Sequence, residues 1–100
     1  MNTFEKLKYD LLMEKGSNYE YLSNTAERMA LLEKGEKEKI EKFSQALAYM
    51  VEAHQAYSEA YLMVPTRQDD KEINHALVAV DRTKERKESI IKRMDNTKIM

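Results

Sequence analysis

The stretch IEKFSQALAYMVEAHQAYSEAYLMV, residues 40–64, decides the fold. Apolar and aromatic side chains recur in it at alternating steps of three and four residues, which is the spacing of one face of an α-helix. The seam lasts about seven turns, as expected of a long helix that is buried along its whole length. Its members are Ile40, Phe43, Leu47, Met50, His54, Tyr57, Tyr61 and Val64.

Two glycines and one proline punctuate the chain, which favours a few long helices over the many turns of a β fold. Gly16 is predicted to end a first helix, and Ser17 with Glu20 has the spacing of a capping box that would begin a second. Pro65 ends the long helix. The sequence leaves open whether Gly35 ends one helix or lies inside a longer one, because an internal glycine costs a helix only ~1 kcal/mol.

The sequence therefore predicts an all-α protein of one domain, residues 1–100, folded as a three- or four-helix bundle on a long antiparallel helical hairpin. The expected helices span residues 4–14, 18–34, 36–63 and 70–95. The last two are joined by the short turn PTRQDD and form the hairpin, with the two shorter helices packed along it. The first helix carries its apolar residues at helical spacing: Phe4, Leu7, Leu11 and Leu12.

The last helix interrupts its own apolar stripe. The stripe runs to Val80, gives way to charge over residues 81–88 and returns at Ile90. In the expected hairpin register, Leu47 and Met50 lie opposite the charged stretch and find no apolar partner in it. Either the first half of the chain covers them, or they stay open and a second chain covers them.

The second arrangement predicts a non-enzymatic protein–protein interaction module, such as a small regulator, inhibitor, adaptor or assembly factor. A chain of 100 residues builds only a modest core, so self-association as a dimer would bury further surface. Tyrosine and methionine suit such a face, because both present large surfaces that adapt to a partner. The candidate partner-binding residues are Leu47, Tyr49, Met50, Ile90, Ile91 and Met94.

A metal site is the first alternative. Glu72 and His75 have the Glu-x-x-His spacing of di-iron helical bundles, and the hairpin register brings Glu59 near them. The motif occurs once, and the simpler interpretation makes His75 a solvated residue with Glu72 as an i,i+3 partner. His54 is expected to be half-buried and hydrogen-bonded to a tyrosine or carboxylate. No cofactor is predicted.

Nucleic-acid binding is the second alternative. Its candidate residues lie on the basic last helix: Arg82, Arg86, Lys87 and Arg93. Acidic residues are interleaved with them, and 17 basic against 18 acidic residues give a net charge of −1, so steering toward phosphates is weak. The helix offers no aromatic platform for bases, which argues against this function.

Composition argues against several other classes. The chain has no cysteine, and we find no glycine-rich phosphate loop or serine elbow, so we predict that it is not an enzyme. No apolar run approaches the ~20 residues of a membrane span. The first residues include acids and lack the apolar core of a signal peptide, which predicts a cytoplasmic protein.

Overall fold

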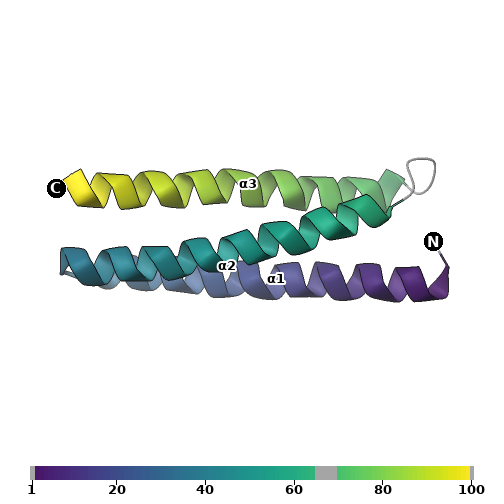
Figure 1. Ribbon diagram of the computed structural model, residues 1–100, viewed down its shortest axis with the longest axis horizontal. Coiled ribbons are helices and arrows are strands. Elements are labelled where there is room, and N and C mark those ends of the chain that lie inside the picture. Colours follow the sequence, from purple (N-terminus) through teal and green to yellow (C-terminus); the bar gives the residue numbers. More distant parts are fainter. Residues whose placement is uncertain (1, 65–69, 100) are drawn as a thin grey trace.

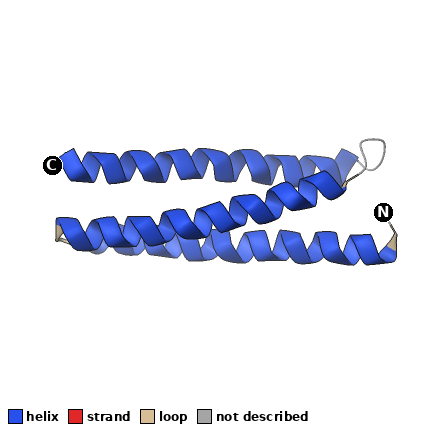
Figure 2. Cartoon of the chain, viewed as in Figure 1, coloured by secondary structure: helices blue, strands red, loops and turns tan. Residues whose placement is uncertain are grey.

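The computed structural model describes residues 2–64 and 70–99, with side chains described outside positions 70–74 and 99. It contains α1 (Thr3–Leu32), α2 (Glu36–Met63) and α3 (Asp70–Ile99), and no strand among the described residues. The helices lie lengthwise side by side, with α2 between α1 and α3, in a bundle of 51 × 18 × 14 Å (Figures 1 and 2). The prediction of an all-α, three- or four-helix bundle is confirmed, and the described residues form three helices.

The predicted break at Gly16 is wrong, because the segments 4–14 and 18–34 belong to one helix, α1. Asn2 caps this helix by accepting a hydrogen bond of 2.8 Å from the backbone N–H of Glu5. Gly16 is buried against α2, where an added Cβ would lie 2.6 Å from Cε1 of Tyr57. The glycine therefore serves the close approach of an aromatic ring, and the helix tolerates it at a cost of about 1 kcal/mol.

Gly35 does separate two helices. Glu33 ends α1 in an extended conformation, and Gly35 precedes the first residue of α2 with φ −83° and ψ 141°. The bounds of α2 agree with the predicted segment 36–63. The last helix, α3, continues to Ile99, beyond the predicted end at residue 95.

The closest helix pair is α1 with α2, not the predicted hairpin of α2 with α3. Small residues make this approach possible, since they recur every seven positions on both helices and are buried. Between two of these residues, the Ser23 hydroxyl donates a 2.6 Å hydrogen bond to the Ala46 carbonyl. A seven-residue repeat keeps the two faces together over many turns. The small residues are Gly16, Ser23 and Ala30 in α1, and Ala46, Ala53 and Ala60 in α2.

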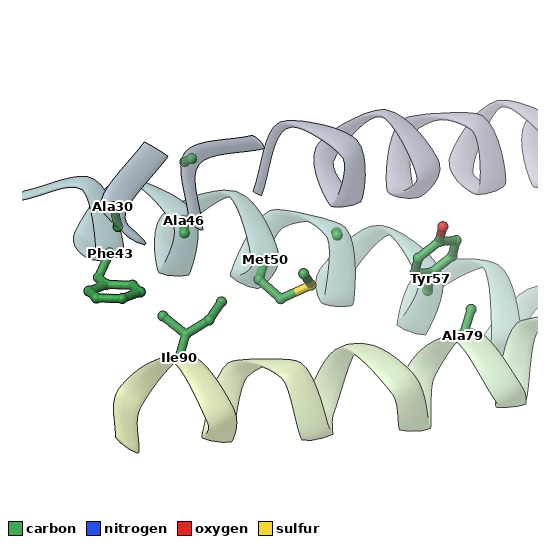
Figure 3. Packing of buried hydrophobic residues seen from close by; sticks show 9 residues of the cluster. Ala30, Phe43, Ala46, Met50, Tyr57, Ala79 and Ile90 are labelled. Carbon is green, nitrogen blue, oxygen red and sulfur yellow. The ribbon is translucent and has the colours of Figure 1, made fainter. Parts of the chain in front are cut away.

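Larger side chains fill the contact between α2 and α3. Phe43 and Met50 point from α2 toward α3, and Ile90 points back from α3 (Figure 3). Met50 and Ile90 have no exposed surface and Phe43 is 2% exposed. The core of the bundle thus lies at Met50 and Ile90, two of the residues predicted to contact a partner.

Candidate functional site

Long polar side chains bridge α1 and α3, whose backbones come close together at few positions. The Arg82 guanidinium donates to both carboxylate oxygens of Glu20, from Nε at 2.8 Å and from Nη2 at 2.7 Å. The hydroxyl of Tyr57, on α2, donates to the same carboxylate at 2.6 Å. Glu20 therefore ties all three helices together through charge-assisted hydrogen bonds.

A second cluster lies further along the same two helices. Glu27 is 7% exposed, accepts a hydrogen bond from Arg86 at 3.3 Å and forms an ion pair with Arg93 at 3.2 Å. Arg86 also donates to Asn24 Oδ1 at 2.5 Å. Part of the charged stretch of α3 is therefore turned toward polar residues of α1. We call this set the polar seam: Glu20, Asn24 and Glu27 on α1, with Arg82, Arg86 and Arg93 on α3.

The electrostatics of the polar seam fix the protonation of its members. Burial acts to raise the pKa of Glu20, but the hydrogen bonds from Arg82 and Tyr57 outweigh it and hold that pKa below its ordinary value. Burial and the Glu20 carboxylate raise the pKa of Tyr57 well above its ordinary value. At neutral pH the carboxylate stays ionised and the phenol stays protonated, which favours a structural role over proton transfer.

A partly buried hydrogen bond lies in the middle of the α2–α3 contact. Nδ1 of His54 lies 2.9 Å from the hydroxyl of Thr83, and that hydroxyl donates to the Ala79 carbonyl at 2.8 Å. Burial, followed by the positive charge of Lys87 and Lys84, lowers the pKa of His54. The partner of His54 is thus a hydroxyl, and not the predicted tyrosine or carboxylate.

The strip predicted to be open is closed at its centre. Met50 and Ile90 are internal core, so the arrangement in which the chain covers its own apolar residues is the one observed at Met50. Thr83 and the polar seam replace the apolar residues that α3 lacks over positions 81–88. Among the other predicted contact residues Ile91 is 45% exposed. The rest are half-buried against the core: Leu47, Tyr49 and Met94.

The predicted metal ligands do not assemble among the described side chains. Glu59 and His75 are exposed, and the side chain of Glu72 lies outside the described residues. His75 borders a shallow depression that also involves Tyr9 and Asp10 of α1. Within the described part of the chain, no three His, Asp or Glu side chains are placed to hold a metal ion.

Three of the four candidate nucleic-acid residues of α3 are engaged within the chain. Arg82, Arg86 and Arg93 are all paired with carboxylates of the polar seam. Lys87 is half-buried. The arginines proposed as phosphate contacts therefore already neutralise Glu20 and Glu27.

Sequence reasoning missed that one apolar face of α1 is exposed and continues beyond Gly16. Five large apolar side chains are exposed there, and on a helix of 3.6 residues per turn they fall within about 60° of arc. This side of α1 lies roughly opposite Glu20 and Glu27, which face α3. We call these residues the apolar stripe: Phe4 (75% exposed), Leu7 (58%), Leu11 (57%), Leu22 (41%) and Met29 (44%).

Polar residues interrupt the apolar stripe at its centre and again at Thr25, between Leu22 and Met29. Lys15 and Asn18 lie between Leu11 and Leu22, and together they border a shallow depression on the outer side of α1. A signal for this face was present in the sequence, because the helical spacing of Phe4 and Leu11 continues at Leu22. The predicted end of the helix at Gly16 hid that continuity.

Comparisons with protein-family models, with curated proteins and with solved structures find no match for this chain. None of the described helices combines the length and the apolar character needed to cross a bilayer. The class of protein is therefore defined by its own fold and exposed surface: a three-helix, all-α bundle with one uncovered apolar stripe.

Proposed function

We propose that this chain is a non-enzymatic protein–protein interaction module that acts in the cytoplasm and binds a protein through the apolar stripe of α1. The observation that supports the proposal is the exposure of the stripe, from 41% at Leu22 to 75% at Phe4, on one side of a single helix. A large exposed apolar surface on a small protein usually marks an interface. A small regulator, inhibitor, adaptor or assembly factor would use such a face.

The exposed apolar residues outside the stripe are scattered over all three helices: Tyr21, Leu31 and Leu32 on α1, Val51, Tyr61 and Leu62 on α2, and Leu77, Val78 and Ile91 on α3. Leu62 on α2 is 80% exposed, and Val78 and Ile91 on α3 are 59% and 45% exposed. Val78 and Ile91 stand thirteen positions apart with the charged stretch between them. Isolated apolar residues of this kind are ordinary on protein surfaces. The stripe instead offers a straight apolar edge, which suits a partner helix laid lengthwise along it.

The alternatives gain no such support. A metal site would need Glu59, Glu72 and His75 together, but Glu59 and His75 are exposed side chains without a third described ligand beside them. Nucleic-acid binding would need arginines that are free to meet phosphates. The seam arginines are instead paired with Glu20 and Glu27.

Affinity capture from the native cell tests the proposal. The bait chains are the wild type, the stripe variant Leu11→Glu/Leu22→Glu and the control variant Leu62→Glu/Val78→Glu, which adds the same charge at exposed apolar sites outside the stripe. We expect the wild type and the control to retain a common protein that the stripe variant loses. Circular dichroism checks that all three chains are equally helical. Equal retention by the stripe variant contradicts the proposal.

A further inference from the structure

We infer that the protein docked on the apolar stripe is a second copy of this chain, with the two α1 helices paired antiparallel about a two-fold axis. The inference rests on the proposed function and identifies its partner. Three features support it: the symmetry of the stripe, the polar residues at its centre and the surface that it exposes.

Four of the five residues of the apolar stripe are placed symmetrically about a midpoint between residues 16 and 17. Phe4 and Met29 are equally far from that point, and so are Leu11 and Leu22. A two-fold interface uses the same patch on both copies and therefore requires a self-complementary surface. In the antiparallel pair, Leu11 faces Leu22 of the second copy and Phe4 faces its Met29. Leu7 then fits between those two residues of the second copy, as a knob enters a hole.

The polar residues at the centre determine the direction of pairing. Lys15 and Asn18 are also equally far from the midpoint, so antiparallel pairing places the Lys15 ammonium opposite the amide oxygen of Asn18 in the second copy. Parallel pairing in register would oppose Lys15 to its own copy and bring two positive charges together. A slip of one turn would place Lys15 against Leu22. Single polar positions in an apolar seam fix register in this way.

Charges beside the stripe agree with the same direction. Asp10 and Arg28 are both exposed and lie on the same flank of the stripe. In the antiparallel pair, Arg28 of one copy stands about 7 Å along the axis from Asp10 of the other. Helical side chains tilt toward their own N-terminus, so these two lean toward each other. An exposed pair of this kind adds little affinity but helps to orient the encounter.

The exposed surface is sufficient for a reversible dimer. The exposed fractions of the five stripe residues correspond to roughly 600 Å² of accessible surface in each copy, so a dimer that covers all of it buries at most about 1,200 Å², the lower end of the range for specific interfaces. The side of α1 that carries the stripe faces away from α3, and the high exposure of Phe4, Leu7 and Leu11 leaves it accessible. We expect dissociation in the micromolar range, because area at this end of the range seldom gives tighter binding.

Sedimentation equilibrium measures the assembly directly. Over concentrations of roughly 10 to 500 µM, chosen to bracket a micromolar interface, the purified wild type should shift from monomer to dimer. Leu11→Glu/Leu22→Glu should remain monomeric with unchanged helicity, and Leu62→Glu/Val78→Glu should dimerise as the wild type does. A wild type that stays monomeric throughout overturns the inference, and so does a stripe variant that dimerises equally well.

Disulfide trapping tests the direction, because the natural chain has no cysteine. The single variants Leu11→Cys and Leu22→Cys are mixed and oxidised. Antiparallel pairing should give mainly the mixed disulfide, because two position-11 thiols would stand about 16 Å apart along the axis, too far to bond. Mainly like-with-like disulfides overturn the inference.

The two proposals fail in different ways. A monomeric wild type whose captured partner is lost on Leu11→Glu/Leu22→Glu overturns the second copy as partner and leaves the interaction face in place. A stripe variant that matches the wild type in both capture and sedimentation overturns both proposals.

Discussion

Replacing Gly16 by alanine should destabilise this protein, although the same change in an exposed helix would stabilise it by about 1 kcal/mol. The new Cβ would lie 2.6, 2.7 and 2.8 Å from Cε1, Cζ and Cδ1 of Tyr57, well inside the optimum of about 3.5–4.0 Å for carbon atoms. The Tyr57 ring is 3% exposed, and its hydroxyl is held by Glu20 at 2.6 Å, so the ring moves only by giving up that bond. If the ring stays in place, the backbone of α1 must shift instead.

The expected magnitude follows from these opposing effects. Overpacking a close contact costs about 1–3 kcal/mol, and weakening the hydrogen bond from Tyr57 to Glu20 costs about 1 kcal/mol more. The gain in helix propensity offsets about 1 kcal/mol of this cost. Gly16→Ala should therefore lower the free energy of unfolding by about 1–3 kcal/mol, measured by urea titration with circular dichroism.

Two comparisons isolate the contact with the ring. Ser17→Ala, at the exposed neighbouring position, should stabilise the protein by a few tenths of a kcal/mol through propensity alone. In a Tyr57→Val background the ring atoms are gone, so Gly16→Ala should there become stabilising. If Gly16→Ala is as stable as the wild type in the natural background, the reasoning about this contact is refuted.

Polar contacts between the helices give three further expectations. Glu20→Ala should lower the free energy of unfolding by about 1–3 kcal/mol, because the Tyr57 hydroxyl loses its acceptor in a half-buried site. Urea titrations of Glu20→Ala and of Arg82→Ala, compared with the wild type, measure this loss. The folded-state pKa of His54 lies below its ordinary value of 6.5, so its contribution to stability is present above pH 6.5 and is lost as pH falls below it. Urea titrations at a series of pH values should show a steeper acid loss for the wild type than for His54→Gln. The pKa of Tyr57 is raised, so its contribution to stability is present below pH 10 and is lost as pH rises above it. A titration followed by phenolate absorbance should show one tyrosine that ionises later than the others, and Tyr57→Phe should remove that step.

The periodic part of the fold was predictable because its signals are local and agree with one another. In α2, the three-and-four spacing from Ile40 to Val64 ends where proline follows, and the helix begins directly after Gly35. The prediction at Gly16 failed because two local signals, a glycine and a capping-box spacing, pointed to a helix end. In the folded protein both residues contact Tyr57 instead: Gly16 makes room for its ring, and Glu20 accepts a hydrogen bond from its hydroxyl.

The apolar residues of α1 show a second limit of sequence reasoning. Tyr9 and Leu11 are close in sequence and similar in apolar surface, yet Tyr9 is 4% exposed and Leu11 is 57% exposed. Periodicity identifies each face of a helix but does not say which face another helix covers. In α1 the small residues Gly16 and Ser23 select the covered face, because only they permit the close approach of α2.

The charged run that interrupts the apolar face of α3 could not be interpreted from the sequence for the same reason. A charged run on a helix is compatible with a solvated face, and 35% of the residues in this chain are charged, so the run alone singles out no partner. Because α1 and α3 both pack antiparallel to α2, they run parallel, and Arg82 and Arg86 advance in step with Glu20 and Asn24. Partly buried ion pairs of this kind are weak sources of stability, but they penalise any rotation of α3 that would leave Glu27 unpaired. The interruption therefore orients α3 against α1, and it is the opposite side of α1 that remains open to a partner.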